Sequence, residues 1–266
     1  MDICEHGHIR PQEVCRLAAH GRAAGTIAVL VLDMKLSIII PAYNEEKRIG
    51  KTISSYVSRF DPKFGNMYEI IVVCDGCTDK TAEIVKNFPR KRGSILCIEK
   101  KNKLGKGGGV LKGFEVASGD IVGFVDADDA FDIDGVEKLV DLVDSGYDCA
   151  IASKWKGRTF LQVTEPFFRK IASRGWNLIL KILFGIKVHD AQAGAKFLKR
   201  NVLKSLPPIR CTGFEFDGEL LWRISQKGFS IEEIYIPTTH MEYSKFHMRQ
   251  SLNMLISILK LRLHIL

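Results

Sequence analysis

The chain has 266 residues, of which 46% are hydrophobic and 26% are charged, and it carries a formal net charge of +8. This composition excludes a disordered chain, and the length allows one large domain or two small ones around a substantial core. Its seven cysteines have no framework spacing, which argues against a disulfide-rich secreted protein and for a reducing compartment.

The N-terminal segment lacks the pattern of a folded element. Its apolar run GTIAVLVL, residues 25–32, is too short to span a bilayer, because a spanning helix needs about 20 apolar residues. No apolar run in the sequence reaches that length. Strong patterning begins only with KLSIIIPAYNEE, directly after Met34. We therefore expect residues 1–33 to be a disordered or wrongly assigned extension and the fold to start at Met34.

From Leu36 onward, short apolar runs alternate regularly with segments of helical spacing. Strands are predicted at 36–40, 69–73, 94–99, 120–125 and 148–153. Helices are predicted between them, at 45–60, 78–88, 105–117 and 134–146. Alternation with short joins is typical of βαβ units, so we predict an α/β fold with a mostly parallel sheet and helices on both faces.

Polar residues follow three of these strands at their carboxyl ends. The first strand ends in PAYNEE, the second in CDGCTD and the fourth in DADD. Ligands of open α/β sheets bind beyond the carboxyl ends of the strands. We therefore predict that these three loops form one ligand site.

Asp126 and Asp128 lie two positions apart where the fourth strand ends. In extended geometry, residues at i and i+2 point the same way, so their carboxylates can share a hard divalent cation. We expect Mg²⁺ or Mn²⁺, because these ions bind through one or two carboxylates and complete their shell with phosphates and water. Asp132 and Asp134 are assigned instead to the start of the following helix, and Asp129 is compatible with either role.

A basic block covers residues 86–112, where nine Lys and Arg residues stand against the single acidic residue Glu99. Its stretch KNKLGKGGGVLKG, 101–113, matches no phosphate-loop consensus, but it is a basic, glycine-rich start of a helix, which suits an anionic ligand. A solvated basic surface is the plain alternative. Because the block lacks interleaved aromatic residues, nucleic acid is not an expected partner.

Cys74 and Cys77 form a C-x-x-C pair directly after the second strand. The spacing is compatible with a redox pair. A zinc site would need two further ligands at suitable spacing, and the sequence shows none. Asp75 lies between the cysteines, just before a helix start. We expect its carboxylate to accept hydrogen bonds from a ligand or to cap the helix.

The ordered motifs together resemble the family-2 glycosyltransferases, whose GT-A fold is Rossmann-like. The motifs are SIIIPAYNEE, VVCDGCTDKT, NKLGKGGGVLKG and GFVDADD, followed by HDAQAGAKFLKR at 189–200, FEFDGELLWRISQKG at 214–228 and EYSKFHMRQSLNML at 242–255. The last three resemble the group of dolichyl-phosphate β-glucosyltransferases and dolichol-phosphate mannose synthases. The resemblance implies transfer of glucose or a related hexose, with inversion and a divalent metal, from a nucleotide sugar, usually UDP-linked, to a polyprenyl (dolichyl) phosphate.

The resemblance also implies roles for individual residues. The base and ribose would be held by Pro41, Tyr43, Glu45 and Asp75, with Lys106 near the nucleotide. Asp126 and Asp128 would hold the metal and the diphosphate. Arg174, Gln192 and Lys196 would face the sugar or the acceptor phosphate. Ala130 supplies no side-chain metal ligand, and Asp129 is the candidate to replace it.

A phosphate acceptor makes a strong base unnecessary. The second pKa of a phosphate monoester is about 6, so the group is mostly a dianion at neutral pH and can attack directly. The enzyme must then position and neutralise two anions, for which Arg174, Lys196 and Arg249 are candidates. If the acceptor is instead a hydroxyl of a soluble molecule or a polysaccharide, Asp217 or Glu215 is the expected base.

Two apolar segments carry narrow polar stripes. The stripe of residues 167–186 consists of Lys170, Arg174, Asn177 and Lys181, and that of residues 251–266 consists of Asn253, Ser257, Lys260 and His264. Such helices fit binding at a membrane surface, and packing on the sheet or on a second subunit is the alternative. We expect a catalytic domain at 34–240, a membrane-proximal amphipathic helix at 241–266, and a peripheral protein on the cytoplasmic face of the membrane. The oligomeric state is left open.

Overall fold

The computed structural model describes residues 34–238 and 248–263. Within these residues, seven strands form one sheet in the order β3-β2-β1-β4-β6-β5-β7. The strands are β1 (Leu36–Ala42), β2 (Tyr68–Asp75), β3 (Ser94–Lys100), β4 (Ile121–Val125), β5 (Cys149–Ser153), β6 (Ala195–Lys199) and β7 (Ile231–Tyr235). The five predicted strands are confirmed as β1 to β5, whereas the expectation for residues 1–33 lies outside the described residues.

The first half of the sheet is parallel, as predicted. β1 pairs with β2 on one side and with β4 on the other, and β2 pairs with β3. Along β1, Ile38 and Ile40 belong to one core and Ile39 belongs to the core on the other face. Because both faces are buried, the strand reads as a continuous apolar run rather than an alternating one.

β6 is antiparallel to both of its neighbours, β4 and β5, and is not among the predicted strands. Its sequence AKFLK contains Lys196, whose charge interrupts the apolar pattern although the side chain is fully buried. β7 pairs in parallel with β5 at the edge of the sheet. The sheet is therefore mostly parallel, with β6 as the exception.

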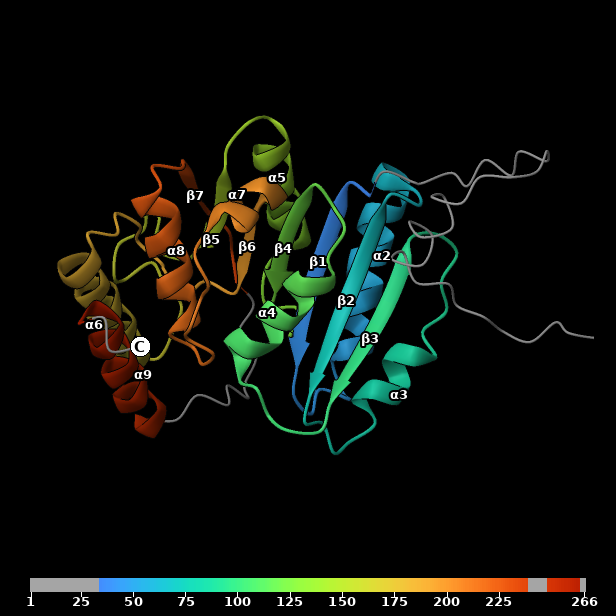
Figure 1. Ribbon diagram of the computed structural model, residues 1–266, viewed down its shortest axis with the longest axis horizontal. Helices are drawn as coiled ribbons and strands as arrows, with labels where there is room; N and C mark the ends of the chain where they lie inside the picture. Colours follow the sequence, from blue (N-terminus) through green and yellow to red (C-terminus); the bar gives the residue numbers. More distant parts are fainter. Residues whose placement is uncertain (1–33, 239–247, 264–266) are drawn as a thin grey trace, which may run out of the picture. The chain divides into compact units, whose positions relative to one another are not determined.

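Helices cover both faces of the sheet (Figure 1). The core on one face receives α2 (Ile49–Phe64), α3 (Thr81–Lys86) and α5 (Ile133–Asp144). The core on the other face receives α4 (Lys106–Val116), α6 (Phe167–Phe184), α7 (Arg200–Ser205), α8 (Phe216–Gln226) and α9 (Met248–Arg262). The predicted arrangement of a sheet between two helical layers is confirmed.

Some helix starts differ from the predictions, because loop contacts hold the chain before the helix. α2 begins at Ile49 rather than at residue 45. α3 begins at Thr81 and not at Thr78, whose amide donates to Asn44 Oδ1 at 2.8 Å and so belongs to a loop. Asp132 is the N-cap of α5, as predicted, and accepts a hydrogen bond from the Gly135 amide at 3.2 Å.

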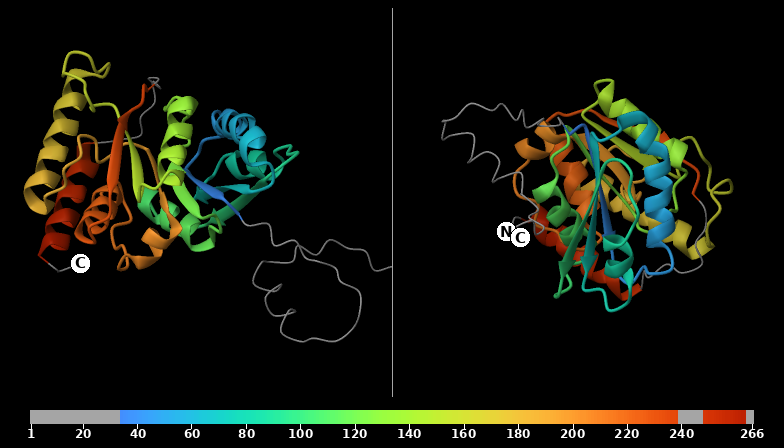
Figure 2. Two further views of the ribbon diagram at one scale, coloured as in Figure 1. Left: turned by 90° about the horizontal axis from the view of Figure 1, so that it is seen from above. Right: turned by 90° about the vertical axis from the view of Figure 1, so that its right-hand side faces the viewer.

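α6 and α9 lie side by side (Figure 2). Arg262 Nε donates to the Leu183 carbonyl at 3.0 Å, and Met254 and Ile258 are buried in the same core as Trp176. α9 therefore packs against α6 and shares a core with it. Among the residues 34–238 and 248–263, no helix is long and apolar enough to cross a membrane.

The predicted polar stripe of α6 largely faces the protein. Lys170 Nζ donates to the Phe160 carbonyl at 2.9 Å, and the Arg174 guanidinium lies 4.1 Å from the centre of the Trp155 ring. The outer side of α6 and α9 is apolar instead, with side chains between 41% and 84% exposed. This outer apolar face consists of Phe167, Phe168, Ile171, Leu178, Ile182, Leu252, Ile256, Leu259 and Leu263.

α4 packs so closely on its neighbours that glycine is required at the contacts. A Cβ atom at Gly113 would overlap the side chain of Ile39 on β1, and a Cβ atom at Gly107 would overlap Phe216 of α8. These two glycines bring the backbone of α4 onto the sheet and place Lys106, its first residue, at the sheet edge.

Replacing Gly113 by Ala should lower the free energy of unfolding by about 1–3 kcal/mol, because the new methyl group overpacks the contact with Ile39. Gly175→Ala in α6 is the matched control, since no described atom lies within 4 Å of its added Cβ. The control should gain about 0.5–1 kcal/mol from helix propensity. Urea unfolding followed by circular dichroism measures both, and equal stability of the two variants would contradict the close packing.

Candidate active site

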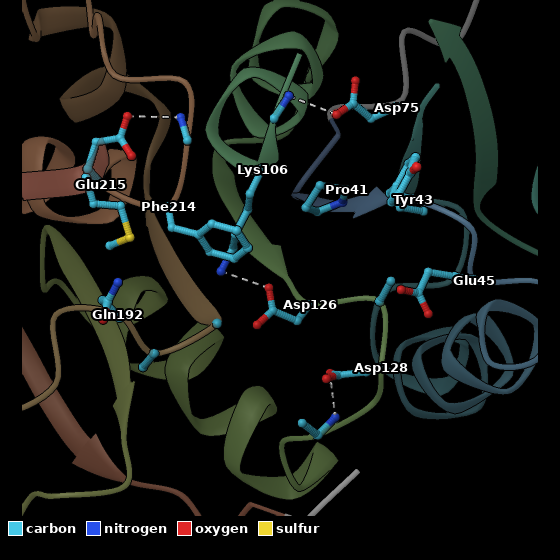
Figure 3. A pocket seen from close by; sticks show the side chains of 18 of the residues that line it. Pro41, Tyr43, Glu45, Asp75, Lys106, Asp126, Asp128, Gln192, Phe214 and Glu215 are labelled. Carbon is cyan, nitrogen blue, oxygen red and sulfur yellow. Dashed lines mark hydrogen bonds and ion pairs between the residues drawn. The ribbon is translucent and has the colours of Figure 1, made fainter. Parts of the chain in front are cut away.

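A cavity of about 800 Å³ opens beyond the carboxyl ends of β1, β2 and β4, where the sequence places the ligand site. Figure 3 shows Tyr43, Glu45 and Asp75 on one side, Gln192 and Glu215 on the opposite side, and Asp126 between them. The predicted site residues that line the cavity are Pro41, Tyr43, Glu45, Asp75, Lys106, Asp126, Asp128, Gln192 and Glu215. The structure thus brings most of the predicted set together.

Asp126 and Asp128 both line this cavity. The Asp126 amide donates to the Gly194 carbonyl at 3.0 Å, which ties the end of β4 to the loop before β6. A Cβ atom at position 194 would overlap the Asp126 carboxylate, so glycine alone leaves room for it. The Ala130 amide donates to Asp128 Oδ1 at 3.2 Å and fixes the second carboxylate.

Lys106, Asp126, Lys196 and Asp217 form a charge cluster that extends from the cavity wall into the core. Lys106 Nζ lies 2.9 Å from Asp126 Oδ1 and 3.6 Å from Asp217 Oδ2. Lys196 Nζ lies 2.6 Å from Asp217 Oδ1 and donates to the Ala193 carbonyl at 2.5 Å. Burial disfavours the Lys106 ammonium, but Asp126 and Asp217 outweigh that effect and hold the pKa of Lys106 above its ordinary value.

Two predicted site residues lie behind the cavity wall rather than in it. Lys196 is 0% exposed and Asp217 is 1% exposed, and neither lines the cavity. Each satisfies the charge of the other, which corrects the expectations that Lys196 faces the ligand and that Asp217 is a base. Glu215, the other predicted base, does line the cavity.

The end of β4 fits a hard divalent cation. Burial and the neighbouring Asp126 raise the pKa of Asp128 to about 6, because two nearby carboxylates repel each other. A cation between them would remove this repulsion, and carboxylate oxygens are ligands that Mg²⁺ and Mn²⁺ prefer. The described part of the chain has no group of three or more acidic, His or Cys side chains suited to a metal, so substrate phosphates and water would complete the shell.

Asp129 does not join these two carboxylates. Its backbone has a φ of 54°, in the left-handed region that few residues other than glycine adopt. Its carboxylate lies 3.8 Å from Lys51 Nζ on α2, and Asp129 is not part of the cavity lining. The expectation that Asp129 replaces a third metal ligand is therefore wrong.

The loop after β1 forms an aromatic wall of the cavity. The Tyr43 side chain is 36% exposed, and Lys103 Nζ lies 3.5 Å from the centre of its ring. Glu45, further along the loop, accepts a hydrogen bond from Arg48 Nε at 2.8 Å. The wall therefore offers an aromatic ring with a cation over one face, which suits an anionic ligand.

Asp75, at the end of β2, organises the glycine-rich start of α4. Its Oδ1 accepts from the Leu104 amide at 2.5 Å, and its Oδ2 accepts from the Gly105 amide at 2.9 Å. Gly105 has a φ of 87°, a conformation that favours glycine. Asp75 thus places the start of α4, and with it Lys106, against the cavity.

The opposite side of the cavity contains residues that sequence reasoning missed. Asp190, Glu165, Lys154 and Arg169 line it, and Asp190 is only 2% exposed. Among the described residues, Asp190 Oδ1 and Glu165 Oε2 are buried without a hydrogen-bond partner. Unpaired buried acceptors are costly, so these two oxygens suit a ligand that brings hydroxyl donors.

Part of this side was recognisable in the sequence. Lys154 directly follows β5, so the strand-end rule applies to it as well. Asp190 stands beside Gln192 in the HDAQAGAK motif. Glu165 and Arg169 come from the loop before α6 and from its first turn, and no local pattern identifies them.

The expectation that Arg174 faces the sugar or the acceptor phosphate also needs correction. Its guanidinium packs on the Trp155 ring, and Arg174 is not part of the cavity lining. Arg169, earlier on the same helix, lines the cavity instead. Arg249, a further predicted cation, lies in the first turn of α9.

Comparison with known proteins identifies the family. Residues 37–206 match the model of glycosyl transferase family 2. Glycosyltransferase AglD of Haloferax volcanii is 31% identical over 209 residues. The match covers 77% of this chain and 33% of AglD, so the chain spans about a third of that protein. The dolichyl-phosphate beta-glucosyltransferase of Saccharomyces cerevisiae is 30% identical over 240 residues, which cover 80% of this chain and 69% of the yeast protein.

A solved structure shares the fold. Glucosyl-3-phosphoglycerate synthase of Mycobacterium tuberculosis, in complex with Mn²⁺, UDP-glucose and glycerol 3-phosphate, has a TM-score of 0.65 to this chain at 22% identity. The match covers 91% of this chain and 86% of the synthase, and it confirms the predicted GT-A fold. Because the family model also matches more than half of its residues, the chain belongs to glycosyl transferase family 2.

Proposed function

We propose that this enzyme transfers glucose or a related hexose, with inversion, from a UDP-linked sugar to a polyprenyl (dolichyl) phosphate. The supporting observation is one cavity in which the carboxylates of Asp126 and Asp128 lie between two sides. One side is the aromatic wall, and the other has buried carboxylate oxygens that can accept hydrogen bonds from hydroxyl groups. The yeast relative named as a dolichyl-phosphate beta-glucosyltransferase supports the same substrate class.

The cavity suits a nucleotide sugar in one orientation. The Tyr43 ring lines the cavity with the Lys103 ammonium over one face, and this pair would hold the base and an adjoining phosphate. Asp190 and Glu165, on the opposite side, offer unpaired oxygens to the hydroxyl groups of the sugar. The diphosphate would then lie between these two sides, next to Lys106.

The centre of the cavity is built to hold negative charge on a leaving group. Mg²⁺ or Mn²⁺, held by Asp126 and Asp128, would neutralise the diphosphate and stabilise its departure. Lys106 contributes a cation that the carboxylates of Asp126 and Asp217 keep protonated and in place. Because Lys106 is fixed by these carboxylates before a ligand binds, its charge is preorganised for the transition state.

Lys154 and Arg169 provide the charge that a phosphate acceptor needs on the sugar side of the cavity. Lys154 is anchored by Glu165, whose Oε1 lies 3.0 Å from its Nζ. An oxygen of the phosphate dianion forms a bond to the anomeric carbon while the bond from that carbon to the diphosphate breaks. Attack from the opposite face inverts the configuration and requires no general base.

The outer apolar face supports a lipid acceptor. α6 and α9, which carry this face, also form part of the cavity wall through Arg169, Asn253 and Ser257. A large exposed apolar surface marks a site of contact with a membrane or a protein, and here it adjoins the cavity. We therefore place the enzyme on the cytoplasmic surface of a membrane, and the free thiols of all described cysteines fit a reducing compartment.

A hydroxyl acceptor is the second candidate, because Glu215 is 8% exposed and lines the cavity. A panel of UDP- and GDP-sugars with extracted polyprenyl phosphate separates the two functions. We expect a labelled product that partitions into organic solvent, formed from a UDP-hexose, with Glu215→Gln retaining transfer. A water-soluble product together with a loss of about 10²–10⁴-fold in Glu215→Gln would favour the hydroxyl acceptor.

Asp128→Asn should reduce transfer by at least about 10²-fold, because the metal and the diphosphate lose one of two carboxylates. Chelation by EDTA should have the same effect on the unaltered enzyme, and Mn²⁺ or Mg²⁺ should restore turnover. Asp134→Asn is the matched control, since its carboxyl group is 61% exposed and outside the cavity. Near-normal turnover of Asp128→Asn with unchanged folding would show that the metal assignment is wrong.

Phe168→Asp should weaken binding to vesicles of anionic lipid and raise the KM for a long-chain polyprenyl phosphate. The reason is that Phe168, in the first turn of α6, is 84% exposed, the most exposed side chain of the outer apolar face. Tyr147→Asp is the control, because Tyr147 is 40% exposed but lies outside α6 and α9. Vesicle sedimentation measures the binding, and equal loss in both variants would argue against a specific membrane contact.

A further inference from the structure

Glu233, on the edge strand β7, is a buried carboxylate that has no lysine or arginine partner among the described residues. It is 4% exposed, and its hydrogen-bond donors all come from the loop between α6 and β6. Oε1 accepts from the His189 amide at 2.9 Å and from the Asp190 amide at 2.8 Å. Oε2 accepts from the His189 amide at 3.0 Å and lies 2.6 Å from His189 Nδ1. Because burial of a charge is costly unless hydrogen bonds satisfy it, this carboxylate holds the loop firmly.

The backbone of this loop depends on side chains for its hydrogen bonds. Three consecutive amides, those of residues 189, 190 and 191, donate to side-chain oxygens. The first two donate to Glu233, and the Ala191 amide donates to Asn177 Oδ1 on α6 at 2.9 Å. Since buried amides need a partner, the position of the loop is set by Glu233 and Asn177.

Asp190 is the residue of this loop that meets a ligand. It lines the cavity although it is only 2% exposed. Its Oδ2 accepts from the Lys154 amide at 3.1 Å, whereas its Oδ1 has no partner among the described residues. Oδ1 is therefore the oxygen left for a ligand, and a hydrogen bond to it requires a donor at about 2.5–3.0 Å. A small shift of the loop would remove that contact.

We propose that Glu233 is a positioning residue for the donor sugar, and that it fixes Asp190 so that Oδ1 accepts a hydrogen bond from a hydroxyl group of a hexose. This inference rests on the proposed function. Glu233 is not part of the cavity lining, so it acts through Asp190 and not on the ligand directly. Tyr43 and Asp75, the proposed holders of the nucleotide, lie on the opposite side of the cavity from Gln192, which belongs to the same loop as Asp190 (Figure 3). Loss of Glu233 should therefore affect the sugar and spare the nucleotide.

The test compares the binding of UDP-glucose and of UDP to Glu233→Met by titration calorimetry, with Mg²⁺ and without an acceptor. Methionine has a similar length but no acceptor oxygen, so the amides of His189 and Asp190 lose their partner. We expect the Kd for UDP-glucose to rise at least about tenfold and the Kd for UDP to change less than about twofold, since only the sugar meets Asp190.

Two control variants separate this role from a general effect on the fold. Glu233→Gln keeps one acceptor oxygen for the two amides and should hold the Kd for UDP-glucose within about threefold of the unaltered enzyme. Glu232→Met changes the preceding residue of β7, whose side chain points to the other face of the sheet. It should bind both ligands as the unaltered enzyme does.

A double-mutant cycle shows whether Glu233 acts through Asp190. In Asp190→Asn, the amide oxygen can still accept from the Lys154 amide, which leaves an NH₂ donor in place of Oδ1. This variant should itself weaken UDP-glucose binding. Adding Glu233→Met to it should cost less than about threefold more, because both changes remove the same contact with the sugar.

Equal losses for UDP and UDP-glucose in Glu233→Met, unchanged binding of UDP-glucose, or additive losses in the double variant would each overturn the positioning role. If circular dichroism shows that Glu233→Met does not fold, Glu233→Asp carries the same expectations, because its carboxylate is one methylene shorter and withdraws from the two amides. Failure of the unaltered enzyme to bind UDP would refute the proposed function and this inference with it.

Discussion

The ion pair between Lys196 and Asp217 is the interaction on which the site depends. Lys196 comes from the antiparallel strand β6 and Asp217 from α8, so the pair fixes a helix to the sheet at the back of the cavity. Two full charges are stable in this core because each is hydrogen-bonded to the other, and removal of one would leave the second uncompensated at a cost of about 3–5 kcal/mol. Asp217 in turn holds Lys106, and Lys106 holds Asp126.

This chain of charges also bears on the proposed cation at Asp128. Within the charge cluster, the two lysines balance Asp126 and Asp217. Asp128 lies next to the cluster with a carboxylate whose pKa is raised by burial and by Asp126. In the proposed function, a divalent cation bound by this carboxylate would balance its charge.

Much of the site follows from the sequence, because the strand-end rule needs only the order of strands and helices. It located Asp75, Asp126 and Asp128, and it would also have located Lys154. It failed for Lys196, since a lysine among apolar residues can face a ligand or enter a buried pair. The partner, Asp217, lies 21 residues away and has no pattern that links the two. Periodicity likewise revealed the two sides of α6, but not which of them faces the protein.

The glycines of α4 have a consequence for the order of folding. Its sequence KGGGVLKGFEV has four glycines, each about 1 kcal/mol less favourable than alanine in a helix. A helix this short and glycine-rich has no stability of its own and forms only against Ile39 and Phe216. We therefore expect α4 to form late, on a sheet and an α8 that are already in place. Lys106 reaches the cavity with it, so we expect a nascent chain to complete this cavity only late in folding.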